Sequence, residues 1–323
     1  MFTVATIWTV CEVFVAVLLT SRYKNSTDLL IDTSLGANMI LLTGITGNIG
    51  SATARALLDK GVKFRALVRN LEKAAPWGEK GIELVQGDLD DAASLQRALA
   101  GVDRALLVMP NGEFQERAEL AFTKAAQAAR LGWLIKLSSP EAVRGTTSPI
   151  PLAHIAAEDA IMASGLKWTF VRPSVYMQNF RGSVKTAQTT GKLSMPMGNG
   201  TIAVTDNNDA GLFIAKILTD ADSTPHYGQC YDITGPDPVM SFHDVARAIG
   251  ETIGKPVVYD DCDPKAFQEA IRPFHRNQWH SDAVARLFAE IANGRTPGHK
   301  TDTFQKIMGR PGRSLREYLA TLV

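Results

Sequence analysis

The feature that most constrains the fold is a glycine-rich turn between a short apolar segment and a predicted helix. Residues 39 to 60 read MILLTGITGNIGSATARALLDK, with Gly44, Gly47 and Gly50 in the turn. Gly44 permits a sharp turn, Gly47 lets the backbone approach a pyrophosphate, and Gly50 lets the helix pack closely on the strand. Free N–H groups at the start of a helix also stabilise negative charge. This order of elements predicts a phosphate-binding turn at the start of an α/β domain.

Strands and helices continue to alternate after this turn. The sequence predicts strands over 63–68, 82–86, 105–108, 134–137 and 168–171, and a helix over 92–100. Repeated β-α-β units predict a parallel sheet with its ligand beyond the carboxyl ends of the strands. We therefore expect a Rossmann-type, doubly wound α/β core over residues 39–172, and a smaller α/β substrate lobe over 173–323 that is interleaved with it.

The end of the second predicted strand bears on the choice between NAD and NADP. A domain specific for NAD places an acidic side chain there, against the ribose 2′-hydroxyl. No Asp or Glu lies between Gly61 and Leu71, and Arg69 stands in that region instead. A guanidinium can pair with a 2′-phosphate, with help from Lys73. This pattern favours NADPH over NADH, and the alternative is that Arg69 is a solvated charge at a strand end.

Two further strand ends are expected to complete the cofactor site. Asp88 and Leu89 follow the third predicted strand, and Met109 and Pro110 follow the fourth. Because ligands of parallel sheets bind at this edge, these residues should line the adenine and ribose side of the crevice. For Asp88 the alternative is that it caps a nearby helix.

Charge and cysteine content narrow the classes of partner. The 34 basic and 33 acidic residues leave a net charge of +1, so no global field attracts nucleic acid or an anionic membrane. Cys11, Cys230 and Cys262 form no CxxC or Cys/His cluster, which predicts a reducing, cytoplasmic location without a metal site. Cys230 and Cys262 are expected to be small core residues. We expect a small-molecule ligand and a monomer or homodimer.

Residues 1–38 differ from the rest of the chain. Phe2 to Thr20 carry a single charge, Glu12, and are long enough to span a bilayer. Four threonines and that central Glu stand against a bilayer span, and the lack of a basic n-region fits a secretory signal poorly. Since the predicted domain can begin at Met39, we expect a dispensable extension without stable membrane association, and the alternative is a marginal membrane anchor.

Six stretches of the sequence resemble the NmrA-like family of atypical short-chain dehydrogenases and reductases. The resemblance extends over about residues 39–322, and the GxxGxxG spacing of the turn is typical of extended and atypical members. The stretches are TGITGNIG at 43–50, ALVRN at 66–70, QGDLDD at 86–91, HIAAEDAIMASGLKWTFVRPSVYMQNF at 154–180, DITGPD at 232–237 and TFQKIMGRPGRSLREYL at 303–319.

Members of this family include NADPH-dependent quinone reductases, azo-dye reductases and plant phenylpropanoid reductases, together with NADP-binding regulators. The resemblance implies an NAD(P)H-dependent reductase that transfers hydride to a quinone, azo compound or similar conjugated acceptor, with a lid after Val171 that closes over the nicotinamide. The alternative is a non-catalytic NADP(H)-sensing regulator. The residues that the resemblance assigns to the cofactor are Gly44, Thr46, Gly47, Asn48, Ile49, Gly50, Arg69, Asp88 and Leu89.

The Tyr-x-x-x-Lys dyad of typical short-chain dehydrogenases is missing. When Glu158 is aligned with the helix glutamate after the dyad, His154 takes the lysine position and Ile150 the tyrosine position. Alcohol-to-ketone chemistry and sugar-nucleotide epimerisation are therefore disfavoured. An electrophilic quinone or azo acceptor needs less help beyond positioning. We expect His154 to donate a proton or to anchor the acceptor, and the alternative is a histidine bonded inside a helix face.

Two other segments are candidates for contact with the acceptor. Ser139 follows the fifth predicted strand, where the superfamily often keeps a hydroxyl that steadies substrate. Tyr176, Met177 and Phe180 follow the sixth strand and together offer an aromatic and thioether surface. Such a surface suits a small planar apolar substrate, although the same residue types also build ordinary cores.

Overall fold

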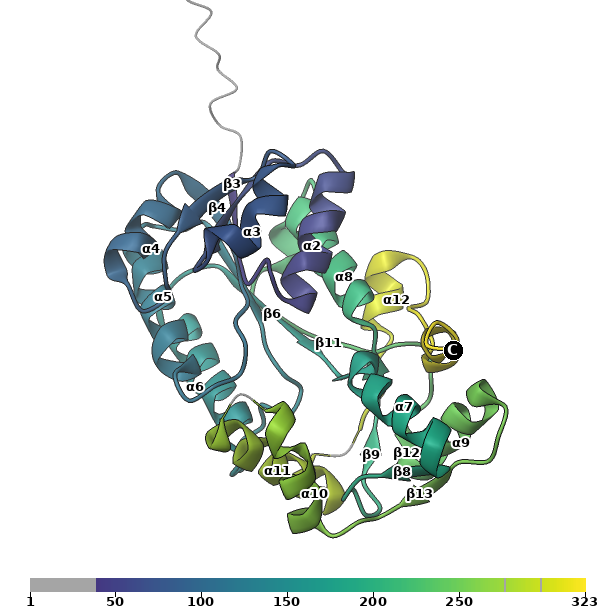
Figure 1. The fold of residues 1–323 in the computed structure, drawn as a ribbon. Coiled ribbons are helices and arrows are strands. Elements are labelled where there is room, and N and C mark those ends of the chain that lie inside the picture. The colour runs from purple at the N-terminus through teal and green to yellow at the C-terminus, as the bar shows by residue number, and fades with distance from the viewer. Residues whose placement is uncertain (1–38, 276, 297) are drawn as a thin grey trace, which may run out of the picture. The chain divides into compact units, whose positions relative to one another are not determined.

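A computed structural model of the protein describes residues 39–275, 277–296 and 298–323. The predictions made for residues 1–38, including Cys11, lie outside these described residues. Within the described part the central sheet has seven strands, all parallel, in the order β11-β6-β5-β4-β1-β2-β3 (Figure 1). The predicted Rossmann-type sheet is confirmed. The strand order reverses between β1 and β4, which is where such sheets open a ligand crevice.

The strands of this sheet are strongly apolar because helices cover both of its faces. Leu42 of β1 lies beside Ala66 of β2 and Leu106 of β4, and all three side chains are fully buried. The strand bounds are β1 (Met39–Thr43), β2 (Phe64–Val68), β3 (Glu83–Gln86), β4 (Val102–Leu107), β5 (Trp133–Leu137), β6 (Trp168–Pro173) and β11 (Gln229–Ile233).

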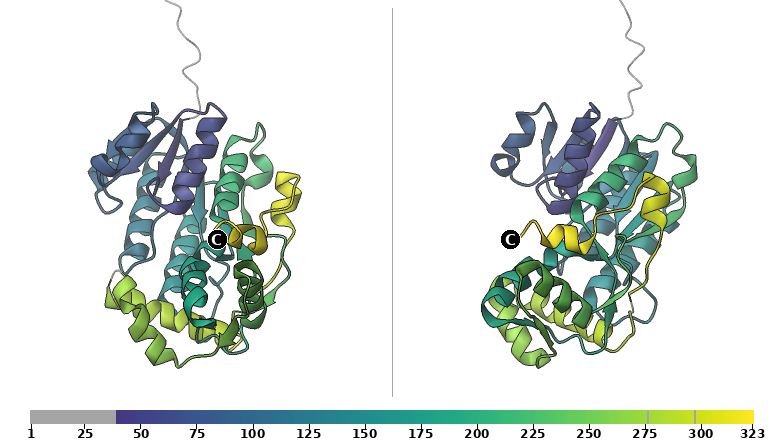
Figure 2. Two further views of the ribbon diagram at one scale, coloured as in Figure 1. Left: turned by 45° about the vertical axis from the view of Figure 1, so that its right-hand side comes forward. Right: turned by 90° about the vertical axis from the view of Figure 1, so that its right-hand side faces the viewer.

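Two groups of helices cover the two faces of the sheet (Figures 1 and 2). One group packs α2 (Asn48–Asp59) against α8 (Asn207–Thr219), with α3 (Leu71–Gly78) beside β3. The other group is a row of α4 (Ala92–Leu99), α5 (Gln115–Ala128) and α6 (Pro149–Ala163), in which each helix contacts the next. Among the helices of the described residues, none is both long and apolar enough to cross a membrane.

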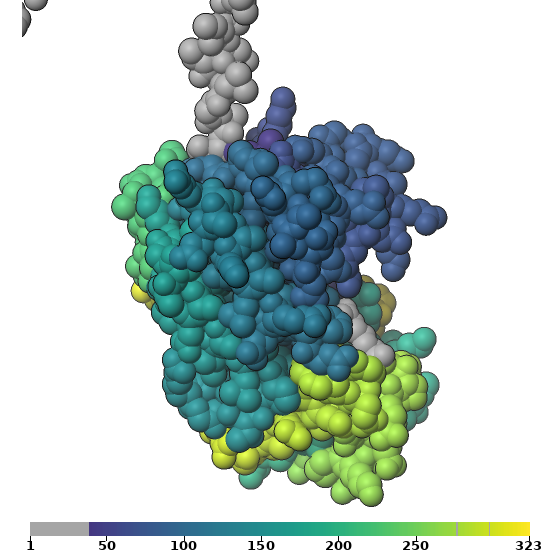
Figure 3. Space-filling view, turned by 90° about the vertical axis from the view of Figure 1, so that its left-hand side faces the viewer, coloured from purple at the N-terminus to yellow at the C-terminus, as the bar shows by residue number. Residues whose placement is uncertain are grey.

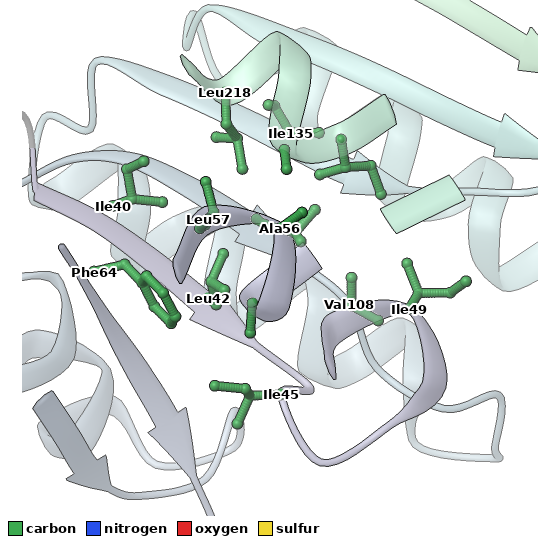
Figure 4. Close-up of a cluster of buried hydrophobic side chains, with 14 of the residues drawn as sticks. Ile40, Leu42, Ile45, Ile49, Ala56, Leu57, Phe64, Val108, Ile135 and Leu218 are labelled. Carbon is green, nitrogen blue, oxygen red and sulfur yellow. The ribbon is translucent and has the colours of Figure 1, made fainter. Parts of the chain in front are cut away.

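The apolar core beside the glycine turn joins strands and helices that are distant in sequence. Leu57 of α2 and Leu218 of α8 belong to the same cluster as Ile40, Leu42 and Ile135 of the sheet (Figure 4). Each of these side chains is buried, and full burial of a side chain of this size contributes about 1.5–3 kcal/mol. This cluster fixes the start of α2, and so the turn before it, against the sheet.

The contact between α2 and α8 depends on a glycine. A Cβ atom placed on Gly211 of α8 would lie 2.4 Å from the Ala52 Cβ and 2.7 Å from the Thr53 backbone nitrogen of α2. Real Cβ atoms do not come this close, so the two helix backbones approach one another only because position 211 has no side chain.

A second apolar cluster forms among the C-terminal segments, around Met177, Phe180 and Phe242. The element bounds are β7 (Val175–Tyr176), η2 (Met177–Phe180), α7 (Arg181–Thr190), β8 (Lys192–Ser194), β9 (Thr201–Ile202), β10 (Val204–Thr205), η3 (Thr224–His226), β12 (Met240–Ser241), α9 (Phe242–Ile253), β13 (Val258–Asp260), α10 (Pro264–Ile271), η4 (Arg272–Phe274), α11 (Gln278–Ala292), α12 (Thr303–Met308) and α13 (Leu315–Leu319). The division into a core over 39–172 and a lobe over 173–323 stays a prediction, while α8 and β11 return from the second range to the sheet.

The two described cysteines are not core residues, so that prediction was wrong. Cys230 is exposed and Cys262 is half-buried. Cys230 lies on β11, the last strand at one end of the sheet, where residues have a neighbouring strand on one side only. Cysteine is expected in the core because it behaves as a small apolar residue. Cys230 is exposed because it lies on an edge strand.

Candidate functional site

A pocket of about 730 Å³ opens at the crevice between β1 and β4 and extends to the C-terminal segments. Its volume is in the range of small-molecule and cofactor sites. Residues predicted for the cofactor and residues predicted for catalysis line the same pocket. Those on its wall are Gly44, Thr46, Gly47, Asn48, Ile49, Arg69, Asp88, Leu89, Met109, Pro110, Ser139 and His154, whereas Gly50 is absent from the lining.

The glycines of the turn have three different environments. Gly44 has φ +66°, and a Cβ there would lie 2.7 Å from the Val108 carbonyl oxygen of the neighbouring strand end. A Cβ on Gly50 would lie 2.2 Å from the Gly44 carbonyl oxygen, so Gly50 serves packing rather than the pocket wall. Gly47 has φ −94°, and a Cβ there would approach only the Gly44 oxygen, at 3.3 Å. The turn therefore keeps open space at Gly47, at the uncapped start of α2, as a pyrophosphate requires.

Two cations stand at the end of β2. Arg69 and Lys73 are exposed and line the pocket, and neither forms an ion pair within the described residues. Asn70 lies between them and caps α3 by accepting the Lys73 backbone N–H at 2.8 Å. The two side chains thus keep their charge unneutralised beside the pocket, which fits the 2′-phosphate of NADP.

Asp88 is not a helix cap, so that alternative was wrong. Asp91 caps α4 by accepting the N–H groups of Ala93 at 3.0 Å and Ser94 at 3.2 Å. Asp88 itself accepts the Asp90 N–H at 3.2 Å and lines the pocket with its neighbour Leu89. Its carboxylate is therefore placed at the strand end where a ribose is expected.

His154 lies on α6 and is held by a buried lysine that sequence reasoning missed. Lys136 Nζ lies 2.8 Å from His154 Nδ1, 2.9 Å from the Leu137 carbonyl oxygen and 3.1 Å from Glu119 Oε1. These three partners use all three ammonium protons, so Nδ1 of the imidazole must accept and Nε2 must carry the proton. Burial above all, then the charges of Lys136 and Arg172, hold the pKa of His154 well below 6.5. The ring is therefore a neutral hydrogen-bond donor with a fixed tautomer.

The ion pair behind His154 lies entirely out of solvent. The side chains of Lys136 and Glu119 are 0% and 1% exposed. A charged pair at this depth is costly unless each partner is compensated, so the contacts of the ammonium matter for folding as well as for the histidine. The one available sequence signal was a lysine inside the apolar strand WLIKL, since lysine is seldom fully buried without a partner.

Glu158 has a structural role next to the site. Arg172 Nε and Nη2 donate to its two carboxylate oxygens at 2.9 and 2.5 Å, and Ser138 Oγ donates to Oε1 at 2.5 Å. These bonds join β5, α6 and β6. They fix the helix that carries His154 against the carboxyl end of the sheet.

A second acidic group enters the pocket from the segment after β5. Ser139 Oγ makes a close hydrogen bond with Glu141 Oε2, and both residues line the pocket with Tyr176. Burial raises the pKa of Glu141, and burial together with the nearby Glu141 raises the pKa of Tyr176. No motif marked Glu141 in the sequence, and only its distance of two residues from Ser139 could have drawn attention to it.

The far end of the pocket is apolar and is built by C-terminal segments. Its lining residues there include Phe180, Met195, Met197, Phe242, Leu287, Phe288 and Ile291. Met177 is fully buried in the second cluster and does not line the pocket, so for this residue the alternative of ordinary core is correct.

Helix α11, which supplies part of that apolar wall, is hydrogen-bonded to the segment before α6. Glu290 accepts hydrogen bonds from Thr146 Oγ1 at 2.7 Å and from the Thr147 N–H at 2.6 Å. Figure 3 shows the light-green α10–α11 region lying against the blue and teal side of the molecule formed by α5 and α6. Burial opposes ionisation of Glu290, but the bonds from both threonines outweigh it and hold the pKa of the carboxyl below its ordinary value.

Comparisons with known proteins identify the family. Residues 36–295 match the model of the NmrA-like family. The NAD(P)H azoreductase of Xenophilus azovorans is 31% identical to this chain, over 87% of the chain and 96% of the azoreductase. Quinone oxidoreductase 2 of Escherichia coli strain K12 is 28% identical over 88% and 98% of the two chains. The fold and site thus define a nucleotide-binding reductase class, and the chain belongs to the NmrA-like family.

Solved structures give the same fold. The NADPH complex of the NADPH-dependent quinone oxidoreductase QOR2 of Escherichia coli superposes with a TM-score of 0.80 at 26% identity, covering 88% of this chain and 99% of the other. The Citrobacter sp. triphenylmethane reductase, complexed with NADP(H), gives a TM-score of 0.79 at 24% identity, covering 88% and 100%. At the latter identity the likeness concerns the fold alone.

Proposed function

We propose that the protein is an NADPH-dependent reductase that transfers hydride to a quinone, azo compound or similar conjugated acceptor. The observation that carries this proposal is that one continuous pocket is lined both by the glycine-rich turn and by aromatic and thioether side chains. The named relatives are an azoreductase and a quinone oxidoreductase, which agrees with this class of reaction.

The residues on the β1 side of the pocket fit NADPH. The start of α2 and the open space at Gly47 would hold the pyrophosphate, and Arg69 with Lys73 would hold the 2′-phosphate. Asp88, Leu89, Met109 and Pro110 would line the adenine and ribose side. NADPH supplies the hydride when it is bound.

The opposite wall fits a planar apolar acceptor. Phe180, Phe242 and Phe288 offer ring faces and edges, and Met195 and Met197 offer polarisable sulfur that adapts to different shapes. Lys136 holds Nδ1 of His154, and the Gln115 side-chain amide nitrogen lies 3.4 Å from Nε2. His154 would offer its Nε2–H to an acceptor oxygen or nitrogen that takes a place beside this amide. A neutral ring favours anchoring and stabilising developing charge over proton release.

Three further expectations belong to the same proposal. Residues 173–323 act as a lid over the acceptor, residues 1–38 are dispensable, and the protein works in the cytoplasm as a monomer or homodimer. Deletion of residues 1–38 should leave NADPH affinity and turnover unchanged. A mature N-terminus at Met1 found in a membrane fraction would favour the anchor.

The test is steady-state oxidation of NADPH against a panel of quinones and azo dyes, with NADH as the comparison cofactor. We expect turnover with at least one conjugated acceptor and a higher kcat/KM for NADPH than for NADH. Tight NADPH binding without turnover on any acceptor would favour the NADP(H)-sensing regulator instead. The Gly47→Val variant serves as the control, because it should lose turnover together with cofactor binding.

A further inference from the structure

The segment after β5 carries a carboxyl group that the proposed hydride transfer does not use. Glu141 lines the pocket, and its Oε2 is in direct hydrogen-bond contact with Ser139 Oγ. The Ala142 N–H donates to the Ser139 carbonyl oxygen at 3.1 Å, so the chain turns between the two residues and brings their side chains together. Within the described residues no Lys or Arg forms an ion pair with Glu141. A carboxyl group in a pocket without a cationic partner tends to keep its proton.

The groups that face Glu141 come from four parts of the chain. They are Ser139 on its own segment, Tyr176 of β7, Asp232 of β11 and His299, which precedes α12. Burial and the charge of Asp232 raise the pKa of Glu141, while the Ser139 hydrogen bond and His299 lower it, and burial prevails. His299 lies 3.1 Å from Asp232 and is half exposed, so this side of the cluster reaches solvent.

His154 and Glu141, two titratable side chains of the pocket, therefore differ in whether they hold an acidic proton that can be transferred. The pKa of His154 is shifted down, so its ring is neutral and has no extra proton to release. The pKa of Glu141 is shifted up, so its carboxyl group holds a proton at higher pH than an exposed glutamate does. The two pKa values are shifted in opposite directions, so burial favours the neutral form of both groups, and only the carboxyl group then has an acidic proton to give.

We propose that Glu141 is the proton donor of this reductase and that Ser139 passes the proton to the acceptor, an assignment that rests on the function proposed above. Once hydride has delivered two electrons, a quinone oxygen or azo nitrogen of the acceptor carries a negative charge. The Ser139 hydroxyl donates to Glu141 Oε2 in the structure, so it first turns its proton toward the charged acceptor atom and leaves Oγ free to accept from Glu141. The acceptor atom then bonds to the hydroxyl proton as the Ser139 O–H bond breaks. Ser139 Oγ then takes the proton from Glu141, which becomes a carboxylate and is reprotonated by solvent water. His154 anchors the acceptor during this step.

The test compares Glu141→Gln, Glu141→Asp and Ser139→Ala with the control Glu79→Gln, an exposed glutamate at the end of α3. Glutamine keeps the size of the side chain but has no acidic proton. Turnover is followed against pH with one quinone and one azo compound, and NADPH affinity is followed by fluorescence titration. Circular dichroism checks that each variant folds.

We expect Glu141→Gln to lower kcat about ten- to a hundredfold with NADPH affinity unchanged, since a positioned acid gives about 10²- to 10⁴-fold and less for a reactive acceptor. The loss should be larger with the azo compound, whose reduced nitrogen is more basic. Because the protonated carboxyl is the active form, turnover of the unchanged protein should fall as the pH rises through the raised pKa of Glu141. This fall with pH should be absent in Glu141→Gln and present in Glu141→Asp. The double variant Ser139→Ala, Glu141→Gln should lose no more turnover than Glu141→Gln alone, because the two residues act in one proton route.

Two results would overturn the assignment, and they differ from failure of the proposed function. An unchanged pH limb in Glu141→Gln would remove Glu141 as the donor. Equal losses with both acceptors, accompanied by weaker NADPH binding, would give Glu141 a structural role. If the unchanged protein oxidises no NADPH with any acceptor, the proposed function itself is wrong and the proton route is wrong with it.

Discussion

The two ends of the pocket are built in different ways. The cofactor end depends on backbone geometry within one short stretch, where Gly44 and Gly50 leave no room for a Cβ and Gly47 leaves space. The acceptor end depends on side chains brought from α6, β7, α9 and α11, which are distant in sequence. Recognition of a common cofactor needs a fixed backbone, whereas recognition of an acceptor depends on which side chains the fold brings together.

The charges at the two ends differ as well. Arg69 and Lys73 are exposed at the cofactor end and form no ion pair with any acidic residue in the part of the chain that the structure describes. At the acceptor end the buried cations are paired, Lys136 with Glu119 and Arg172 with Glu158. Unpaired cations favour binding of phosphate, while paired ones leave an apolar pocket with a few fixed donors. We therefore expect the cofactor end to determine the affinity for NADPH and the acceptor end to determine the rate of hydride transfer.

The largest effect is expected from filling the space at the turn. Gly47→Val should abolish NADPH binding, lowering affinity more than about a hundredfold, because the new side chain occupies the pyrophosphate position. The fold should persist, since φ −94° is accessible to valine and the nearest contact of the new Cβ is 3.3 Å away. Calorimetric titration with NADPH and circular dichroism measure the two outcomes. Retained affinity would mean that this turn is not the phosphate site.

That contrast also explains how much of the protein could be predicted from its sequence. The alternation of strands and helices, the glycine turn and the position of Arg69 follow from local patterns, because each depends on neighbours within a few residues. Glu141 and the Lys136–Glu119 pair could not be predicted as part of the site, because their roles depend on contacts between separate elements. The close packing expected at Gly50 is present, since a Cβ there would lie 2.2 Å from the Gly44 carbonyl oxygen, while its contact with the cofactor stays a prediction.

A smaller effect is expected from reversing the charge at the end of β2. Arg69→Asp should invert the preference for NADPH over NADH, because it replaces a partner of the 2′-phosphate with one suited to a free 2′-hydroxyl. A partly desolvated arginine–phosphate pair contributes about 1.5–3 kcal/mol, so the ratio of the two dissociation constants should change at least about tenfold. Arg97→Asp, an exposed arginine on α4, is the matched control. Equal affinities of the unchanged protein for both cofactors would contradict this account.

At the acceptor end, His154→Ala should lower turnover about ten- to a hundredfold without weakening NADPH binding. The imidazole lies on α6, away from the glycine turn, and is held by Lys136 in its neutral form. Because a neutral ring does not titrate near pH 6.5, the variant should lose rate without losing a pH limb in that range. Steady-state kinetics from pH 5 to 9 measures both, and an undiminished rate with quinones would exclude His154 as a participant.

The smallest effect concerns the stability of the fold. It compares a glycine of α8, which packs on α2 of the cofactor end, with a glycine of α7 among the C-terminal segments. Gly211→Leu should lower the free energy of unfolding by about 1–3 kcal/mol, since any Cβ at this position collides with α2. Gly182→Ala in α7 is the matched control, because its Cβ would meet nothing within 4 Å. That change should stabilise by up to about 1 kcal/mol. Urea unfolding measures both, and equal effects of the two substitutions would contradict the close packing of α2 on α8.

The most direct test of the central claim, that one pocket brings NADPH and a conjugated acceptor together for hydride transfer, is single-turnover oxidation of NADPH deuterated at the transferred position. We expect a loss of NADPH absorbance equal to the amount of quinone reduced, slowed by a primary isotope effect. Tight binding of NADPH with no loss of absorbance on addition of any quinone or azo compound would contradict it.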